Sequence, residues 1–151
     1  MNVVTRLSDM GIELPPAAAP VASYVPVVVH DGMAYVSGQL PFIEGTLVTG
    51  KLGQDLATER GIQAARACGL MILAQLEAAD VLDRVARVVK LGGFVASTPD
   101  FTDQPKVANG ASDLMVEVFG DAGKHARAAV GVPVLPLNAA VEVDAIFALK
   151  A

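Results

Sequence analysis

The sequence is poor in the residues that build disulfide frameworks, metal sites and nucleic-acid surfaces. Among 151 residues it has one cysteine, two histidines and no tryptophan, and aromatic residues make up 5%. A single cysteine excludes a disulfide framework and any Cys-x-x-Cys motif. The 11 Lys and Arg residues are scattered and outnumbered by 16 Asp and Glu residues, whereas nucleic-acid binders cluster cations among stacking aromatics. We therefore expect no nucleic-acid partner, no metal or other cofactor, and a reducing, cytoplasmic location.

Charged residues are also scarce. They make up 18% of the chain, against 53% apolar residues and a mean hydropathy of +0.50, while soluble domains average about 25% charged residues. The length suits a single domain over residues 1–151. The apolar surplus indicates either a large core or, as we favour, subunit interfaces, because a domain this small keeps much of its surface exposed. We expect a closed homo-oligomer.

Neither a membrane span nor a signal peptide is expected from the sequence. The longest uncharged stretch, residues 14–30, contains four prolines, so it cannot form a spanning helix. Charged residues at Arg6, Asp9 and Glu13 interrupt the region where a signal peptide needs an apolar core.

Hydrophobic periodicity predicts an α+β fold. The sequence Asp31-Gly32 is a type I′ turn signal and joins two short strands at 25–30 and 33–37 into a hairpin. Apolar residues recur at helical spacing over residues 56–79 and 107–119. The other predicted elements are an extended lead-in at 1–20, a short strand or turn at 46–49, and strands at 85–95, 126–132 and 140–149. This order predicts a mixed sheet with two helices on one face, and an apolar opposite face that other subunits cover.

Several residues that could carry chemistry are better explained structurally. Residues 45–52 come within one residue of a phosphate-binding loop, but the last position lacks the hydroxyl that holds Mg²⁺, so a glycine-rich hairpin loop is expected. His30 and His125 have no metal-ligand spacing. Cys68 lies on the apolar face of the first predicted helix, where it behaves as a small hydrophobic residue, and Ser37 lacks the Gly-x-Ser-x-Gly elbow of a hydrolase.

Arg127 stands out because it lies in an otherwise apolar strand. Strand alternation places it on one face with Ala129 and Gly131, which are too small to cover it. Its guanidinium can pair with a carboxylate of the protein or of a ligand. Glu142 and Asp144 lie on the last predicted strand, where charged residues need partners or water. The pattern alone favours a structural salt bridge over a cleft that holds one arginine and one acid.

Two separated sequence motifs are characteristic when they occur together. The first is Tyr24 followed by Val-Ser-Gly-Gln-Leu-Pro at 36–41, and the second is Ala126-Arg127 followed by Leu-Pro at 135–136 and Val-Glu-Val-Asp-Ala at 141–145. They resemble the RidA family, whose members are also called YjgF proteins or reactive intermediate deaminases. The resemblance extends over roughly residues 23–149. It implies a chorismate-mutase-like α+β fold assembled as a homotrimer, with clefts between the subunits.

The resemblance also implies an activity. Family members hydrolyse enamines and imines such as 2-aminoacrylate to 2-keto acids and ammonia, without cofactor or metal. By position, Arg127 matches the arginine that binds the substrate carboxylate, and Glu142 matches the glutamate that positions water. The residues that match the cleft lining are Tyr24, Ser37, Gly38 and Asn109.

This chain departs from the family pattern beside the arginine. Ala128 and Ala129 replace the serine and cysteine that many deaminases carry there, so the expected cleft floor is roomier and more apolar. The departure keeps open a second function, a non-catalytic trimer that binds small carboxylates such as 2-keto acids. A third, endoribonuclease, has the least support because the chain is acidic, poor in aromatics and lacks a catalytic histidine pair.

Overall fold

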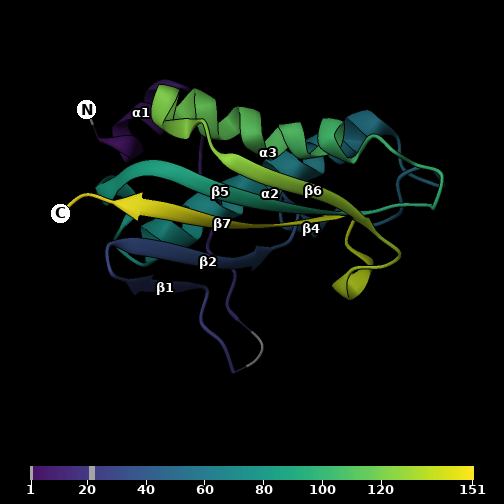
Figure 1. The fold of residues 1–151 in the computed structure, drawn as a ribbon, viewed down its shortest axis with the longest axis horizontal. Coiled ribbons are helices and arrows are strands. Elements are labelled where there is room, and N and C mark those ends of the chain that lie inside the picture. The colour runs from purple at the N-terminus through teal and green to yellow at the C-terminus, as the bar shows by residue number, and fades with distance from the viewer. Residues whose placement is uncertain (1, 21–22) are drawn as a thin grey trace.

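A five-stranded β-sheet with helices against one face forms the body of the molecule in the computed structural model, which describes residues 2–20 and 23–151 (Figure 1). The strand order is β1-β2-β7-β5-β6, in which β5 and β6 are parallel and the other neighbours are antiparallel. The strands of this sheet are β1 (Val27–His30), β2 (Met33–Gln39), β5 (Val85–Ala96), β6 (Ala126–Val132) and β7 (Val141–Leu149), and β3 (Phe42–Ile43) pairs with β4 (Thr46–Leu47) in a separate hairpin. The helices are α1 (Val3–Asp9), α2 (Thr58–Ala78) and α3 (Gln104–Phe119), with short 3-10 turns η1 (Leu82–Arg84), η2 (Gly120–Gly123) and η3 (Pro136–Asn138). The predicted α+β architecture is confirmed.

Local sequence signals place most element boundaries. Asp31 and Gly32 have φ angles of 50° and 75°, which is the type I′ geometry expected between β1 and β2. α3 begins three residues earlier than residue 107 because Pro105 occupies its first turn, where a missing N–H breaks no helical hydrogen bond. The predicted segment 46–49 is a strand only over its first two residues.

The N-terminal segment is not extended throughout, so the prediction for residues 1–20 is wrong over α1. Asn2 caps this helix by accepting a hydrogen bond from the Thr5 N–H, and Leu7 is buried. A helix of seven residues has too few turns to show a clear apolar period in the sequence. Residues 12–20 have no regular structure, and the Gln75 side chain of α2 holds them by donating to the Ala18 carbonyl at 2.7 Å.

The hydrophobic core lies between the sheet and the two long helices. α2 packs against β2 and β7, and α3 packs against β5 and β6. The helices approach each other closely at two glycines: a methyl group on Gly110 would overlap the Ile62 carbonyl oxygen of α2, and one on Gly69 would lie 2.9 Å from the Leu114 side chain. Close backbone contact at Gly110 therefore sets how near α3 lies to α2.

We expect Gly110→Ala to lower the free energy of unfolding by about 2–3 kcal/mol, the upper part of the range for overpacked cores. The added methyl meets backbone, which cannot rotate away. Gly69→Ala meets the end of a leucine side chain and should cost less. Urea unfolding of both variants measures the difference. A stabilised Gly110→Ala protein, as helix propensity alone would give, would contradict the close contact.

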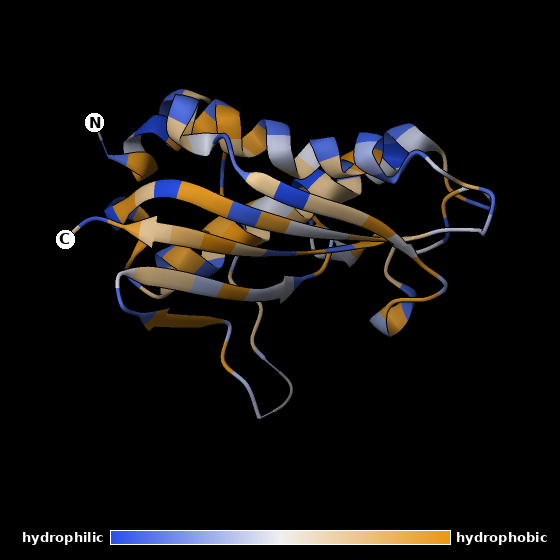
Figure 2. Ribbon diagram, in the orientation of Figure 1, coloured by the Kyte–Doolittle hydropathy of each residue, from blue (hydrophilic) through white to orange (hydrophobic). Residues whose placement is uncertain are grey.

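The opposite face of the sheet carries no helix among the described residues and exposes several apolar side chains. Val28, Tyr35 and Val130 are 49%, 43% and 46% exposed. Figure 2 shows β1 in orange along most of its length, although three of its four residues are exposed. We call this surface the open face. In the described part of the chain, no helix has the length and apolar character needed to cross a membrane.

Candidate functional site

Arg127 lies on β6 at the edge of the sheet and points toward α3. Its Nη1 donates hydrogen bonds to Asn109 Oδ1 at 2.8 Å and to Ser112 Oγ at 3.1 Å. These two acceptors are three residues apart, so they share one face of the helix. Ala129, the next residue on the same face of β6, is too small to cover the guanidinium, which stays half-buried. The structure thus brings together Asn109 and Arg127, two of the residues predicted to bind the substrate.

The hydrogen bonds of Arg127 leave one edge of its guanidinium free. An arginine side chain has five N–H donors, and both donors on Nη1 are taken by Asn109 and Ser112. No Asp or Glu of residues 2–20 and 23–151 forms an ion pair with Arg127. The Nε and Nη2 donors form a fork whose spacing matches the two oxygens of a carboxylate. The free edge of Arg127 thus has a geometry suited to an anion of that shape.

The salt bridge that the strand patterns favoured, from Arg127 to Glu142 or Asp144, is wrong. Residues of β7 alternate between the buried core and the open face, and both acids lie on the open face. Arg127 lies on the helix side, because its partners belong to α3. In addition, β5 separates β6 from β7. The sheet therefore stands between the guanidinium and both carboxylates.

Glu142 forms a second cluster with predicted cleft residues of β2. Its carboxylate lies over Gly38, where a methyl group would overlap it. The pairing of β2 with β7 shifts register between Val36 and Gln39, so Gly38 sits in a bulge. Ser37 Oγ donates to the Val25 carbonyl at 2.9 Å, and Tyr24, which is 50% exposed, directly precedes that carbonyl in the chain. The predicted site residues thus divide into two clusters on opposite faces.

The two carboxyls on the open face have pKa values above those of ordinary carboxyls. Partial burial, and then the neighbouring charge of Asp144, raise the pKa of Glu142. Burial also raises the pKa of Asp144, against the opposing effects of the Gly92 N–H and of Lys90. Glu142 is therefore better suited to accept and release a proton near neutral pH than an ordinary glutamate.

These raised pKa values predict a pH-dependent stability. The folded chain holds protons on carboxyls that release them when unfolded, so the free energy of unfolding falls as pH rises from the ordinary carboxyl pKa through the raised one. We expect Glu142→Gln to raise the unfolding temperature at pH 7 and not at pH 3.5. The gain should be below about 1 kcal/mol, because solvent screens a partly exposed charge. Thermal unfolding measures it, with Glu44→Gln in an exposed turn as control. An equal gain at both pH values would contradict the assignment.

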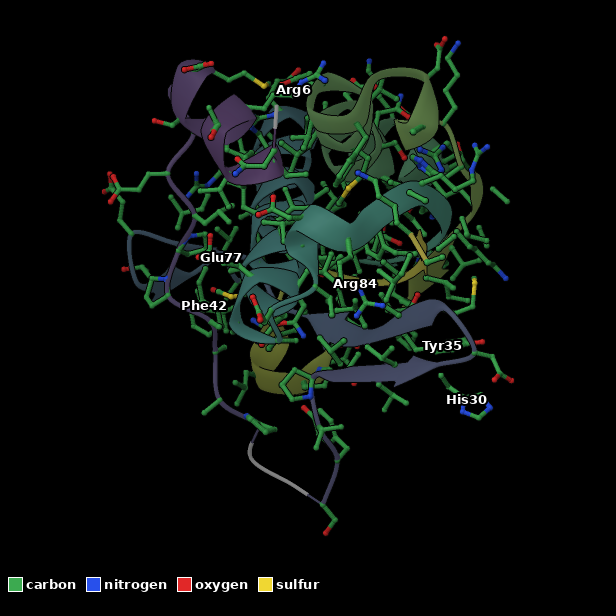
Figure 3. The ribbon with its side chains drawn as sticks, turned by 90° about the vertical axis from the view of Figure 1, so that its left-hand side faces the viewer. Arg6, His30, Tyr35, Phe42, Glu77 and Arg84 are labelled. Atoms are coloured by element: carbon green, nitrogen blue, oxygen red, sulfur yellow. The ribbon has the colours of Figure 1, made fainter. Side chains whose placement is uncertain are left out.

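Residues 45–52, Cys68 and His30, which the sequence predicts to have structural and not catalytic roles, lie outside the two clusters described above. Residues 45–52 lie on β4 and the irregular chain around it, not at the start of a helix, so they do not form a phosphate-binding loop. Cys68 is fully buried, and burial raises the pKa of its thiol well above the usual value. Figure 3 shows His30 projecting from the end of the β1–β2 hairpin, where it lies 3.2 Å from Asp31. Within the described residues, no group of three His, Cys, Asp or Glu side chains is placed to hold a metal ion.

Sequence reasoning missed two residues of the arginine cluster. His125 Nε2 lies 2.8 Å from Ser112 Oγ, and its Nδ1 lies 2.6 Å from the Gly123 carbonyl oxygen. One signal was available, because residues 125 and 127 are two apart and therefore point to the same side of an extended chain. His125 is considered above only as a possible metal ligand, and its spacing from Arg127 is not used there. Ser112 has no signal of its own apart from its spacing of three residues from Asn109.

Comparison with known proteins places the whole fold in one family. Residues 4–149 match the family model described as "YjgF/chorismate mutase-like, putative endoribonuclease". The chain is 53% identical over 152 residues to Protein TCP17 of Trypanosoma cruzi, and the match covers 99% of this chain and 95% of that protein.

Two solved structures share the fold over nearly their full length. The protein Atu1372 from Agrobacterium tumefaciens, of unknown function, is 46% identical with a TM-score of 0.89, and the match covers 98% of this chain and 92% of that one. A protein from Shewanella oneidensis MR-1, described as a "putative endoribonuclease", is 34% identical with a TM-score of 0.92, and the match covers 99% of this chain and 100% of that one.

Proposed function

Because the chain belongs to the YjgF/chorismate-mutase-like family, we propose that it hydrolyses small reactive enamines and imines that carry a carboxylate, such as 2-aminoacrylate, to 2-keto acids and ammonia. The observation that carries the proposal is the free Nε–Nη2 edge of Arg127. Two neutral acceptors, Asn109 and Ser112, hold the guanidinium without neutralising it. Arg127 has no carboxylate partner in the described protein and lies beside Asn109, which matches the family's cleft lining. Its guanidinium is therefore suited to bind the carboxylate of a substrate.

The reaction needs orientation and proton transfer more than strong activation. Protonation of the enamine at its methylene carbon gives an imine, water adds to the imine carbon, and the tetrahedral adduct expels ammonia to leave the 2-keto acid. Arg127 would fix the carboxylate next to the reacting carbon. Glu142, whose pKa is raised by burial, would take a proton from the attacking water and return it to the leaving nitrogen.

A cleft that holds both Arg127 and Glu142 requires two copies of the chain. Within one chain the two side chains lie on opposite faces of the sheet and two strands apart. The proposed assembly is the homotrimer, with each cleft between two subunits. Such an assembly also covers exposed apolar residues of the open face, such as Val28 and Tyr35. A small carboxylate is then the ligand that the cleft takes from solution.

The test is the release of keto acid from freshly generated 2-aminoacrylate, measured above the spontaneous rate with and without the purified protein. Acceleration supports the deaminase. No acceleration, together with binding of 2-ketobutyrate by calorimetry, would favour the second function, a non-catalytic carboxylate binder. Ala129 is the observation that keeps this alternative, since it leaves no reactive side chain beside Arg127 on β6.

An endoribonuclease is the weakest candidate, although the matching family model and one similar structure carry that description. Phosphate backbones are bound by clustered cations. Here the open face presents the carboxyls of Glu142 and Asp144, and the chain has a net charge of −5. Neither feature attracts RNA.

A further inference from the structure

A continuous chain of hydrogen bonds leads from the backbone to the carboxylate anchor. It runs from the Gly123 carbonyl to His125 Nδ1 at 2.6 Å, from His125 Nε2 to Ser112 Oγ at 2.8 Å, and from Ser112 Oγ to Arg127 Nη1 at 3.1 Å. Arg127 Nη1 donates its second hydrogen bond to Asn109 Oδ1 at 2.8 Å. Neither the reaction steps above nor the family motifs use His125 or Ser112.

The donors in this chain can be assigned by elimination. A carbonyl oxygen only accepts, so the Nδ1 of His125 carries a hydrogen. In the neutral imidazole, Nε2 is then an acceptor and takes the hydroxyl hydrogen of Ser112. The guanidinium of Arg127 only donates, so the Ser112 oxygen accepts from Nη1. Neutral His125 thus turns the hydroxyl away from Arg127 and presents an oxygen lone pair to it.

Protonation of His125 reverses one link of the chain. Nε2 then carries a hydrogen and becomes the donor to Ser112 Oγ, while the bond from Nδ1 to Gly123 is kept. The Ser112 hydroxyl hydrogen loses its acceptor and is free to turn toward a bound anion. The imidazolium also adds a second positive charge near Arg127, since His125 directly precedes β6 and is two residues from Arg127 in the chain. Both changes favour a carboxylate at the guanidinium.

We propose that His125 is a positioning residue of the carboxylate site: it fixes Arg127 through Ser112, and its protonation strengthens carboxylate binding. The proposal rests on the proposed function insofar as Arg127 takes a carboxylate. It adds that carboxylate binding is linked to uptake of a proton by His125.

Several charged residues lie on the elements around the His125 imidazole, and two of the acids among them already form ion pairs. On the elements packed around His125, the charged residues are Arg87 and Lys90 of β5, Arg127 of β6, Lys106, Asp113 and Glu117 of α3, Asp121 of η2, and Lys124, which follows η2. Glu117 pairs with Arg66 at 3.4 Å, and Asp121 pairs with Lys124 at 3.3 Å. Asp113 is exposed. Because Glu142 of a second copy also titrates in the proposed cleft, its contribution must be separated by mutation.

The experiment is calorimetric titration of the full-length protein with 2-ketobutyrate at pH 5.5 and pH 8.0. We expect the parent to bind about five-fold more tightly at pH 5.5, the order expected for one added charge in a solvated site. His125→Gln places an amide that still accepts from Ser112 but does not titrate, so in a Glu142→Gln background its affinity should be the same at both pH values. Ser112→Ala removes the hydroxyl but keeps the charge of His125, so its pH effect should be smaller than that of the parent. His30→Gln and Glu142→Gln should keep the pH effect.

The outcomes separate this inference from the function it rests on. A parent protein with equal affinity at both pH values, or a His125→Gln protein that keeps the pH effect in the Glu142→Gln background, would overturn the role of His125 and leave the carboxylate site intact. A parent protein that binds no carboxylate at either pH would overturn the proposed function and, with it, this inference. If His125→Gln does not fold, Ser112→Ala decides the question: a smaller pH effect supports the link through Ser112, and an unchanged effect overturns it.

Discussion

An Arg127→Ala protein should bind 2-ketobutyrate at least about ten-fold more weakly than the parent, and it should not accelerate 2-aminoacrylate hydrolysis above the spontaneous rate. Each hydrogen bond to a charged group contributes about 1.5–3 kcal/mol, and the free edge of Arg127 offers two. No other cation pairs with the same acceptors on α3 in the described chain, so nothing replaces the lost fork. Calorimetry measures the binding, and keto-acid release measures the rate.

The control variants separate charge from geometry. Arg127→Lys keeps one positive charge, but it has no planar fork, and with three donors it keeps only one for the carboxylate once it donates to Asn109 and Ser112. It should therefore recover only a small part of the lost affinity. Arg60→Ala removes an exposed arginine of α2 that bonds to Gln63, and it should behave as the parent. If Arg127→Ala binds 2-ketobutyrate as tightly as the parent, Arg127 is not the anchor.

Elements defined by neighbouring residues could be predicted from the sequence. The turn at Asp31-Gly32 has its expected geometry because two positive φ angles need residue types that tolerate them. Strand β6 runs over the predicted residues 126–132, since alternation of small apolar residues extends through it. The importance of Arg127 followed from the same alternation, which left it without a covering side chain.

Relations between distant elements could not be predicted in this way. Alternation shows which residues of one strand share a face, but it does not show which face the helices cover. Arg127 and Glu142 were therefore placed as partners although the sheet separates them. The link from His125 to Ser112 joins residues of a strand edge and a helix, and only the packing of α3 along β6 creates it. The single buried residue of α1, Leu7, gave too weak a signal for a helix.

The separation of Arg127 from Glu142 leads to the second large effect, recovery of activity when two inactive variants are combined. Arg127→Ala lacks the carboxylate anchor, and Glu142→Gln lacks the group that transfers protons, so each alone should be inactive. In the proposed ring of three subunits, each cleft would take Arg127 from one chain and Glu142 from its neighbour. A trimer that contains both variants then has one junction where an intact Arg127 faces an intact Glu142.

Purified mixed trimers should therefore recover about a third of the parental rate, whichever variant is in excess, because every such ring has one intact junction among three. Co-expression with two different affinity tags isolates them, and sedimentation should give a mass about three times the 15.5 kDa of one chain. Mixed trimers as inactive as either variant would mean that both groups serve a cleft from the same chain. That result requires Arg127 to leave Asn109 and Ser112 and pass the sheet edge, which the two hydrogen bonds of its Nη1 oppose.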